Sequence, residues 1–419
     1  MVVWAYEAKA TAVALMALAV AAVGGAALVQ EPAALPAALE RLEREHEGFD
    51  HRLDALAKSV DDLLWFERVG EVAVVEKARI VGPPKWKEAN PNAIGAGNPV
   101  KFYTYLFTPR ADFGGAKLPL LVFPHGGVHA DFDTYYTHVV RELIAQGYIV
   151  VAPEYRGSTG YGRDFYQSID YGGREVDDCL AARDWAVANH PRVDSGRVGL
   201  IGWSHGGLIT LMSLFDHPDK YVVGFAGVPV SDLVQRMGYS TDDYRELYSA
   251  DYFLGQTAHD NLAEYKRRSP AWNVDKLTRP VRIHGNRSDE DVNVIEVEHL
   301  IQALKAAGKP FEAEIYDLPG GHSFDRLDTP EAWWVRREIY RFLARYLRPP
   351  RPDVELGLNA EGRAAPEGGA GHHRPFAAMR PSPSAVALRV VGAGRRRRGH
   401  LRPRRLQSRS GSRTTGSDG

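Results

Sequence analysis

Short apolar runs and helix-like stretches alternate along most of this 419-residue chain. The apolar runs end in Gly, Pro or polar residues, as in LPLLVFPHGG, YIVVAPEYRG, RVGLIGWSHGG, YVVGFAGVPV and RPVRIHGN. Segments such as GREVDDCLAARDWAVANH and IEVEHLIQALKAAGK separate them. Near-continuous apolar strands joined by helices are typical of a mostly parallel sheet that is covered on both faces. The sequence therefore predicts a doubly wound α/β domain over residues 98–349.

Three other regions flank this domain. Residues 1–30 contain roughly twenty small, apolar positions after Lys9, which is typical of a signal peptide or a membrane anchor, so we expect export or anchoring. Residues 31–97 are expected to form a helical extension and a linker. Residues 350–419 are rich in Arg, Pro and Gly, and their composition predicts a disordered tail. The net charge of −1 gives no reason to expect a nucleic-acid partner for the folded domain.

The extension contains a heptad-like pattern. Apolar residues and one histidine alternate there at spacings of three and four: Leu39, Leu42, His46, Phe49, Leu53, Leu56, Val60 and Leu63. This pattern fits a short coiled coil, and hence a homodimer, or an amphipathic helix that packs on the main domain. The packed helix is the commoner arrangement of the two. Cys179 is the only cysteine, so the core must stabilise the fold without an intrachain disulfide.

Polar residues follow the predicted strands at their carboxyl ends, where open α/β sheets bind ligands. Ser204 lies in Gly-Trp-Ser-His-Gly-Gly, and its small neighbours permit the tight strand-to-helix turn of an activated nucleophile. Asp289 and Asp291 follow RPVRIHGN, and His322 follows FEAEIYDLPGG. The order Ser, Asp, His is that of the α/β-hydrolase triad, in which the histidine takes the serine proton and a carboxylate orients the imidazole.

Two segments supply backbone donors for an oxyanion. The N–H of His205 lies at the start of the helix that follows the serine, where N–H groups have no partner within the helix. The HGG motif follows an earlier strand, and its two glycines let the backbone approach a substrate closely. We expect the second donor to be the N–H of Gly127, or else that of Gly126.

The HGGVHAD segment also raises the question of a metal site. His125 and His129 are four residues apart, and Asp131 follows. That spacing brings two ligands together only on a helix, and two glycines directly after a strand argue against a helix there. We therefore expect neither a metal nor an organic cofactor.

The motifs HGG, EYRGSTGYGRDF, GWSHGG, SDEDVNV and GGHSF, in this order, resemble the catalytic domain of the prolyl oligopeptidase family of serine peptidases. The resemblance spans residues 98–347. The RGSTGYG stretch is its more specific part, because esterases and lipases in general share only HGG and G-x-S-x-G.

The resemblance implies a role for each matching residue. It implies Ser204 as the nucleophile, His322 as the base and the His205 N–H as an oxyanion donor. The family places its acid three residues before a valine, which matches Asp289. One extra residue precedes that acid here, so Asp291 stays an alternative.

Two features depart from the family pattern. Some members use a Tyr side chain in the oxyanion hole where this chain has His125, so we expect backbone donors instead. Members usually carry a large β-propeller before the catalytic domain, and fewer than a hundred residues precede the sheet here. We expect a catalytic domain without a propeller, and hence neither size filtering by a propeller nor dipeptide release.

These observations predict an α/β-hydrolase that cuts peptide bonds through an acyl-enzyme. The alternatives are a carboxylesterase with the same triad, or a non-catalytic scaffold that pairs through its N-terminal helix. The segment between Ser204 and Asp289 contains Tyr239, Tyr244 and Tyr248, which either line a substrate pocket or pack an ordinary excursion.

Overall fold

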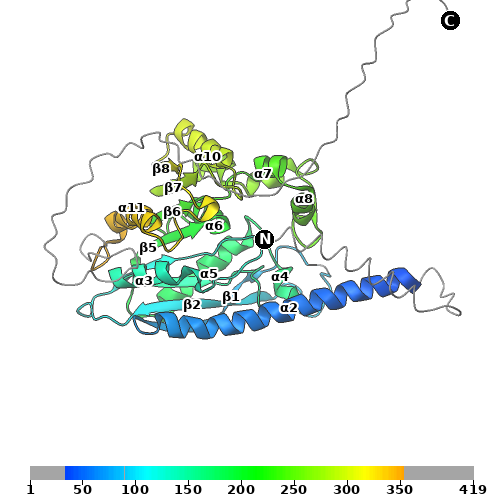
Figure 1. The fold of residues 1–419 in the computed structure, drawn as a ribbon, viewed down its shortest axis with the longest axis horizontal. Coiled ribbons are helices and arrows are strands. Elements are labelled where there is room, and N and C mark those ends of the chain that lie inside the picture. Colours follow the sequence, from blue (N-terminus) through cyan, green and yellow to red (C-terminus); the bar gives the residue numbers. More distant parts are fainter. Residues whose placement is uncertain (1–33, 89, 353–419) are drawn as a thin grey trace, which may run out of the picture. The chain divides into compact units, whose positions relative to one another are not determined.

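The structure is a computed structural model, and it describes residues 34–88 and 90–352 (Figure 1). The predicted signal peptide or anchor, and the Arg-rich tail beyond residue 352, lie outside the described residues. Within the described ranges no helix has both the length and the apolar character needed to cross a membrane.

One eight-stranded sheet contains every strand of the described region (Figure 1). The strand order is β1-β2-β4-β3-β5-β6-β7-β8, and all neighbours from β4 to β8 pair in parallel. Only β1 with β2 and β2 with β4 are antiparallel. The predicted, mostly parallel α/β sheet is therefore confirmed. The strands are β1 (Ala73–Pro84), β2 (Pro99–Pro109), β3 (Leu118–Val122), β4 (Ile149–Pro153), β5 (Val193–Trp203), β6 (Val223–Gly227), β7 (Val281–Asn286) and β8 (Phe311–Tyr316).

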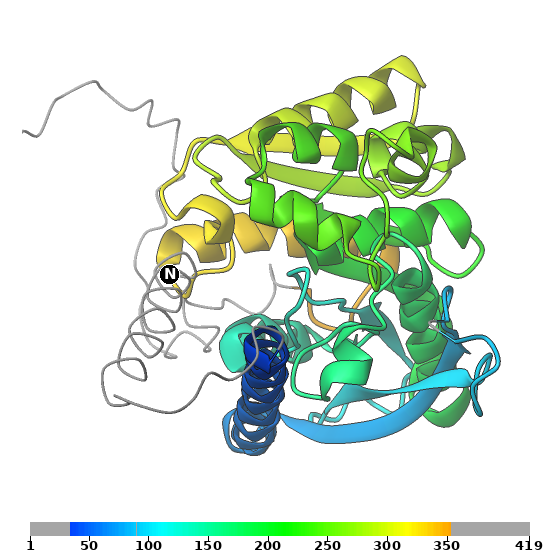
Figure 2. The ribbon, with the colours of Figure 1, turned by 90° about the vertical axis from the view of Figure 1, so that its right-hand side faces the viewer.

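Helices cover both faces of the sheet (Figure 2). One face buries the apolar sides of α5 (Arg174–Asn189), α6 (His205–Asp216) and α10 (Val294–Ala306). The other face buries those of α3 (Thr137–Gln146) and α11 (Pro330–Leu347). The shorter elements are α4 (Arg163–Tyr166), α7 (Leu233–Tyr239), α8 (Asp242–Ser249), α9 (Leu262–Arg267), η1 (Thr134–Tyr136), η2 (Pro270–Trp272), η3 (Val274–Lys276) and η4 (Gly321–Ser323).

Local sequence signals fix the ends of these helices. The Thr329 side chain accepts the N–H of Ala332 and caps α11, whose first residue is Pro330, a position where proline loses no hydrogen bond. Gly147 ends α3 in the left-handed conformation, with φ of 91°.

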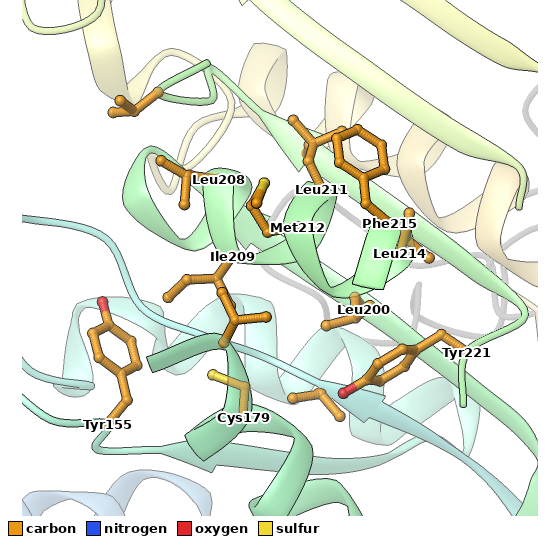
Figure 3. Packing of buried hydrophobic residues seen from close by; sticks show 14 of the residues in the cluster. Tyr155, Cys179, Leu200, Leu208, Ile209, Leu211, Met212, Leu214, Phe215 and Tyr221 are labelled. Atoms are coloured by element: carbon orange, nitrogen blue, oxygen red, sulfur yellow. The ribbon is translucent and has the colours of Figure 1, made fainter. Parts of the chain in front are cut away.

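The helix that follows Ser204 is apolar on nearly every side, and the structure buries it. Figure 3 shows its side chains, including Ile209 and Met212, beside Leu200 of β5 and Cys179 of α5. The Cys179 thiol is free and fully buried. Burial of apolar area of this kind is the main favourable contribution to folding.

The domain boundary expected at residue 98 is too late. β1 pairs with β2 in a register that runs from Ala73 opposite Pro109 to Pro84 opposite Pro99, so part of the expected linker belongs to the sheet. Buried and exposed positions alternate at both ends of β1, and its charged residues, Glu76, Lys77 and Arg79, are not buried. This is the pattern of a strand with one solvated face, unlike the continuous apolar runs of the parallel strands.

The rest of the extension is one long helix, α2 (Ala34–Val69), at the β1–β2 side of the sheet (Figures 1 and 2). Its Trp65 is fully buried and stacks on Phe132, with ring centroids 5.3 Å apart, and it also contacts Phe107 at 4.9 Å. α2 therefore packs on the domain, but not through the heptad residues from which a packed helix was predicted. Those residues face solvent.

Candidate active site

Ser204 occupies a sharp turn between β5 and α6. Its backbone has φ of 59° and ψ of −122°, and Ser204 is one of only three non-glycine residues with positive φ in the described part of the chain. Its N–H donates to the carbonyl of Gly227 (2.9 Å), which anchors the turn to β6. A side chain held in such a rare conformation marks a functional constraint, and this geometry is that of a nucleophile elbow.

The glycines around Ser204 are required by close backbone contacts. A Cβ atom on Gly206 would lie 2.2 Å from the carbonyl oxygen of Pro124, and one on Gly202 would lie 2.3 Å from that of Gly206. The first turn of α6 therefore packs against both β5 and the chain that leaves β3. This packing brings Gly126 close to the serine, because a Cβ atom built on Gly126 would lie 3.3 Å from that of Ser204.

His322 lies in η4, after β8, and pairs with Asp289. The Nδ1 atom of His322 is 2.8 Å from Oδ2 of Asp289, whose side chain is almost fully buried. The other carboxylate oxygen of Asp289 accepts the N–H groups of Asp291 (2.9 Å) and Val292 (2.8 Å). These bonds fix the carboxylate, so it can hold the imidazole in the tautomer that leaves Nε2 free to accept a proton.

The geometry favours Asp289 over Asp291 as the acid. The Asp291 backbone donates to Asp289, while it is the Asp289 side chain that contacts His322. Although one extra residue precedes the acid in this sequence, His322 still pairs with Asp289 and not with Asp291.

Asn286 was not predicted as part of the site. It ends β7, and its side-chain nitrogen donates to the carbonyls of Leu318 and Gly321, both at 3.0 Å, while its side-chain oxygen accepts the N–H of Leu318 (3.1 Å). Asn286 thus ties the strand that precedes Asp289 to the loop that carries His322. The only sequence signal was a polar residue at the carboxyl end of a buried strand.

A cavity of about 370 Å³ brings these groups together. Ser204, His322, Gly126 and Gly127 all line it, although they come from three separate loops. Ligands of open α/β sheets bind at this end of the strands, so the cavity is the candidate substrate site.

The side chain of His205 links the two predicted oxyanion donors. His205 is the first residue of α6, and its Nδ1 lies 2.9 Å from the carbonyl of Gly127. Its Nε2 lies 3.1 Å from Oε1 of Glu175, and its ring stacks on Tyr171 at 3.8 Å. The imidazole therefore holds the Gly127 backbone beside the start of α6. This role of the His205 side chain was not foreseen.

The His125 ring has other partners than an oxyanion. It is buried and stacked on Tyr155, with Nε2 2.9 Å from the Ser158 hydroxyl and Nδ1 2.9 Å from the carbonyl of Gly126. His129 lies apart from it and stacks on Tyr166. Residues 34–88 and 90–352 contain no group of three or more side chains that could hold a metal ion.

Helix α2 reaches the wall of the cavity through Lys58. The Lys58 ammonium lies 2.8 Å from Asp131, which lines the cavity, and 2.6 Å from Glu154. Burial alone would lower the pKa of Lys58, but the two carboxylates outweigh burial and raise it. Asp61 adds a second link, because its Oδ1 accepts the N–H (3.0 Å) and the hydroxyl (2.6 Å) of Thr134. Sequence reasoning had assigned α2 no part in the site.

The three tyrosines of the excursion have different environments. Tyr244 lines the cavity, and Tyr248 is fully buried in the core. Tyr239 contacts Glu296, which also pairs with Arg236 at 3.0 Å. Arg236 lines the cavity as well, which the sequence did not predict.

The parallel sheet, the serine on a strand-to-helix turn and the pair of His322 with the buried Asp289 define an α/β-hydrolase. The model of the prolyl oligopeptidase family matches residues 134–349, and the chain belongs to this family.

Similar proteins carry names of related peptidases. The chain is 30% identical over 230 residues to the uncharacterized peptidase YuxL of Bacillus subtilis. The matched region covers 54% of this chain and 34% of that protein. It is 28% identical over 244 residues to an acylamino-acid-releasing enzyme of Arabidopsis thaliana, covering 57% and 31% of the two chains. The chain thus spans about a third of the length of these relatives.

Solved structures share the fold. A puromycin-hydrolyzing peptidase of Mycobacterium tuberculosis superposes with a TM-score of 0.53 at 24% identity, over 67% of this chain and 40% of that one. An acylaminoacyl peptidase of Pyrococcus horikoshii superposes with a TM-score of 0.54 at 19% identity, over 68% and 43%. Within residues 34–88 and 90–352, every strand belongs to the hydrolase sheet and none to a propeller.

Proposed function

We propose that this protein is a serine peptidase that hydrolyses amide bonds of short peptides or acylated amino acids. The observation that carries the proposal is the 2.8 Å contact between His322 and Asp289, at a cavity that Ser204 also lines. Similarity to proteins named as peptidases and acylamino-acid-releasing enzymes supports amides as the substrate class.

In the proposed mechanism, the Ser204 hydroxyl oxygen attacks the substrate carbonyl carbon, and Nε2 of His322 takes the hydroxyl proton. Asp289 stabilises the imidazolium that forms. The N–H groups of His205 and Gly127 stabilise the negative oxygen of the tetrahedral intermediate. The C–N bond then breaks as His322 gives its proton to the leaving amine, which leaves an acyl-enzyme on Ser204.

Water completes the cycle. His322 removes a proton from a water molecule, the hydroxide attacks the acyl carbon, and Ser204 recovers its proton as the carboxylic acid leaves. Every proton movement is served by His322, so the proposal needs neither a metal nor an organic cofactor.

The test compares amide and ester hydrolysis by the wild type and by Ser204→Ala. Acetylated and free aminoacyl p-nitroanilides serve as amides, and p-nitrophenyl butyrate serves as the ester. We expect amide turnover by the wild type and a loss of roughly 10³-fold or more in the variant. Amide turnover that survives in Ser204→Ala would refute the nucleophile, and turnover of the ester alone would replace the peptidase by an esterase.

A further inference from the structure

An apolar stripe runs along α2 and faces solvent. It consists of Leu39, Leu42, His46, Phe49, Leu53, Leu56, Val60 and Leu63, called the α2 stripe below. Its seven apolar side chains are 39% to 70% exposed. They extend over roughly 36 Å of helix, given a rise of about 1.5 Å per residue.

The face of α2 that packs on the domain is the opposite one. If the α2 stripe occupies positions a and d of a heptad, His51, Lys58 and Trp65 all occupy position f, on the far side of the helix. His51 packs edge-on against Tyr166, Lys58 bonds to the loop at the cavity, and Trp65 is buried in the core. Docking on the domain therefore turns the α2 stripe outward.

The first part of α2 has no packed face. Residues 39–46 are exposed all round, and in Figure 1 this part of the helix (darkest blue) extends past the strands. An isolated helical segment of a few turns is marginal in water, because helix formation has a costly nucleus and needs tertiary packing. Both the exposure and the length of α2 call for something to cover the α2 stripe.

The area is sufficient for a specific interface. Seven apolar side chains that each offer on the order of 100 Å² would bury roughly 1,400 Å² between two copies, which lies within the range of specific protein–protein interfaces. Exposed apolar patches much larger than a few hundred Å² are rare on monomeric proteins.

The repeat and the charge select the occupant. Strict alternation of three and four gives a period of 3.5 residues, which is the period of a two-stranded seam between helices. Helices that lie on membranes are instead rich in Lys and Arg on their polar face. α2 contains nine Asp and Glu against five Lys and Arg, a net charge of −4, so it is poorly suited to an anionic lipid surface.

We propose that the α2 stripe pairs with the α2 stripe of a second copy of this chain, in an antiparallel coiled coil. A parallel pair would place Glu45, at position g, against Asp50 of the partner subunit, at position e, and like charges oppose each other there. In the antiparallel pair, g positions share an edge with g positions. With full overlap of the two stripes, Glu45 lies nearest the uncharged Ser59 of the partner subunit, and the two Arg52 side chains meet at the two-fold axis. The layers then match Leu42 with Val60 and Phe49 with Leu53.

The first experiment measures the mass of the full chain by sedimentation over a range of concentrations. We expect the wild type to be a dimer. The dimer dissociation constant of the variant Leu53→Glu/Leu56→Glu should be ~100-fold higher or more. The matched control is Ile94→Glu/Trp334→Glu, which changes two exposed apolar residues away from α2 and should stay dimeric. Circular dichroism checks that each variant is folded. A monomeric wild type, or a dimer that the α2 variant leaves intact, overturns the proposal.

The second experiment tests the orientation by disulfide formation. The only native cysteine, Cys179, is buried, so introduced thiols react alone. Chains with Leu42→Cys mixed with chains with Val60→Cys should form a mixed disulfide, and neither should cross-link efficiently to itself. Self-linking of each variant without the mixed product would overturn the antiparallel arrangement.

A lipid occupant is the remaining outcome. Vesicles of phosphatidylcholine with phosphatidylglycerol are mixed with wild type and with Leu53→Glu/Leu56→Glu. We expect both proteins to behave alike. Vesicle binding that the variant loses, combined with a monomeric wild type in solution, would assign the α2 stripe to a membrane surface and refute the pairing.

Discussion

Replacing Lys58 by methionine should destabilise the protein strongly, although Lys58 belongs to a helix outside the catalytic motifs. Its side chain is 3% exposed and lies between Asp131 and the fully buried Glu154. Methionine is unbranched like lysine, one atom shorter, and carries no charge. The two carboxylates would then lose the cation that balances them.

The size of the loss follows from this burial. Removing one partner of a buried ion pair costs about 3–5 kcal/mol when the other charge stays in a poorly solvated site. Burial raises the pKa of Glu154 to about 7 even with Lys58 in place, so Glu154 can take up a proton in the variant, and we expect a loss at the lower end of that range. The second substitution, Glu154→Gln, removes the more deeply buried carboxylate. The double variant Lys58→Met/Glu154→Gln should therefore recover part of the stability that Lys58→Met loses.

The assay is urea unfolding followed by circular dichroism at pH 7.5. The matched control is Lys276→Met, since Lys276 pairs with Asp216 at 2.9 Å on the surface, with side chains 47% and 39% exposed. Exposed pairs contribute about 0–1 kcal/mol, so the control should lose less than that. Hydrogen exchange of residues 127–134 should also become faster in Lys58→Met, because α2 holds this loop at the cavity.

The reasoning is contradicted if the free energy of unfolding of Lys58→Met lies within about 0.5 kcal/mol of the wild-type value. A change that small is typical of a surface substitution. A double variant that is less stable than Lys58→Met would contradict the reasoning too. Either result would mean that Lys58 does not neutralise the buried carboxylates.

Three further predictions follow from single positions. Gly206→Ala should lose most activity and destabilise the fold, because its Cβ atom would lie 2.2 Å from a backbone oxygen. The control Gly238→Ala, whose Cβ would have nothing within 4 Å, should leave stability equal or about 0.5–1 kcal/mol higher. Urea unfolding and turnover compare the two variants, and equal behaviour would refute the steric argument. Burial lowers the pKa of His129 to about 4, so the unfolded chain binds a proton near pH 6.5 that the folded protein refuses. The free energy of unfolding should therefore fall as the pH drops from 6.5 towards 4, and this group alone should contribute about 2 kcal/mol less at pH 5 than at pH 8. His129→Asn should remove that part of the pH dependence. If the variant keeps the same slope of stability against pH, His129 does not titrate this way. Asp289→Asn should lower kcat by about 10⁴-fold and Asp291→Asn by less than tenfold, and the reverse order would assign the acid to Asp291.

Residues at strand ends could be predicted well from the sequence. A buried parallel strand is a continuous apolar run, so its end is legible, and the polar residue that follows it must lie at the ligand-binding edge of the sheet. Ser204 and His322 were found this way, and the structure places both at one cavity. The choice between Asp289 and Asp291 needed the direction of each side chain, which the sequence does not fix.

Contacts between distant segments could not be predicted. Lys58 meets its partners 73 and 96 residues further along the chain, and no local pattern indicates that pairing. The docked face of α2 was hidden for a related reason, since it carries Lys58 and His51, while the exposed face carries the regular apolar repeat. An edge strand such as β1 was missed because it is no continuous apolar run: Glu76, Lys77 and Arg79 interrupt it, and none of the three is buried.

The central claim is that Ser204 is an activated nucleophile. It is tested most directly by labelling the purified protein with a fluorophosphonate probe, beside Ser204→Ala and His322→Ala. The account predicts strong labelling of the wild type, no labelling of Ser204→Ala and a large loss in His322→Ala, because the hydroxyl reacts only when His322 takes its proton. Folded wild-type protein that stays unlabelled, or labelling that persists without Ser204, would contradict it.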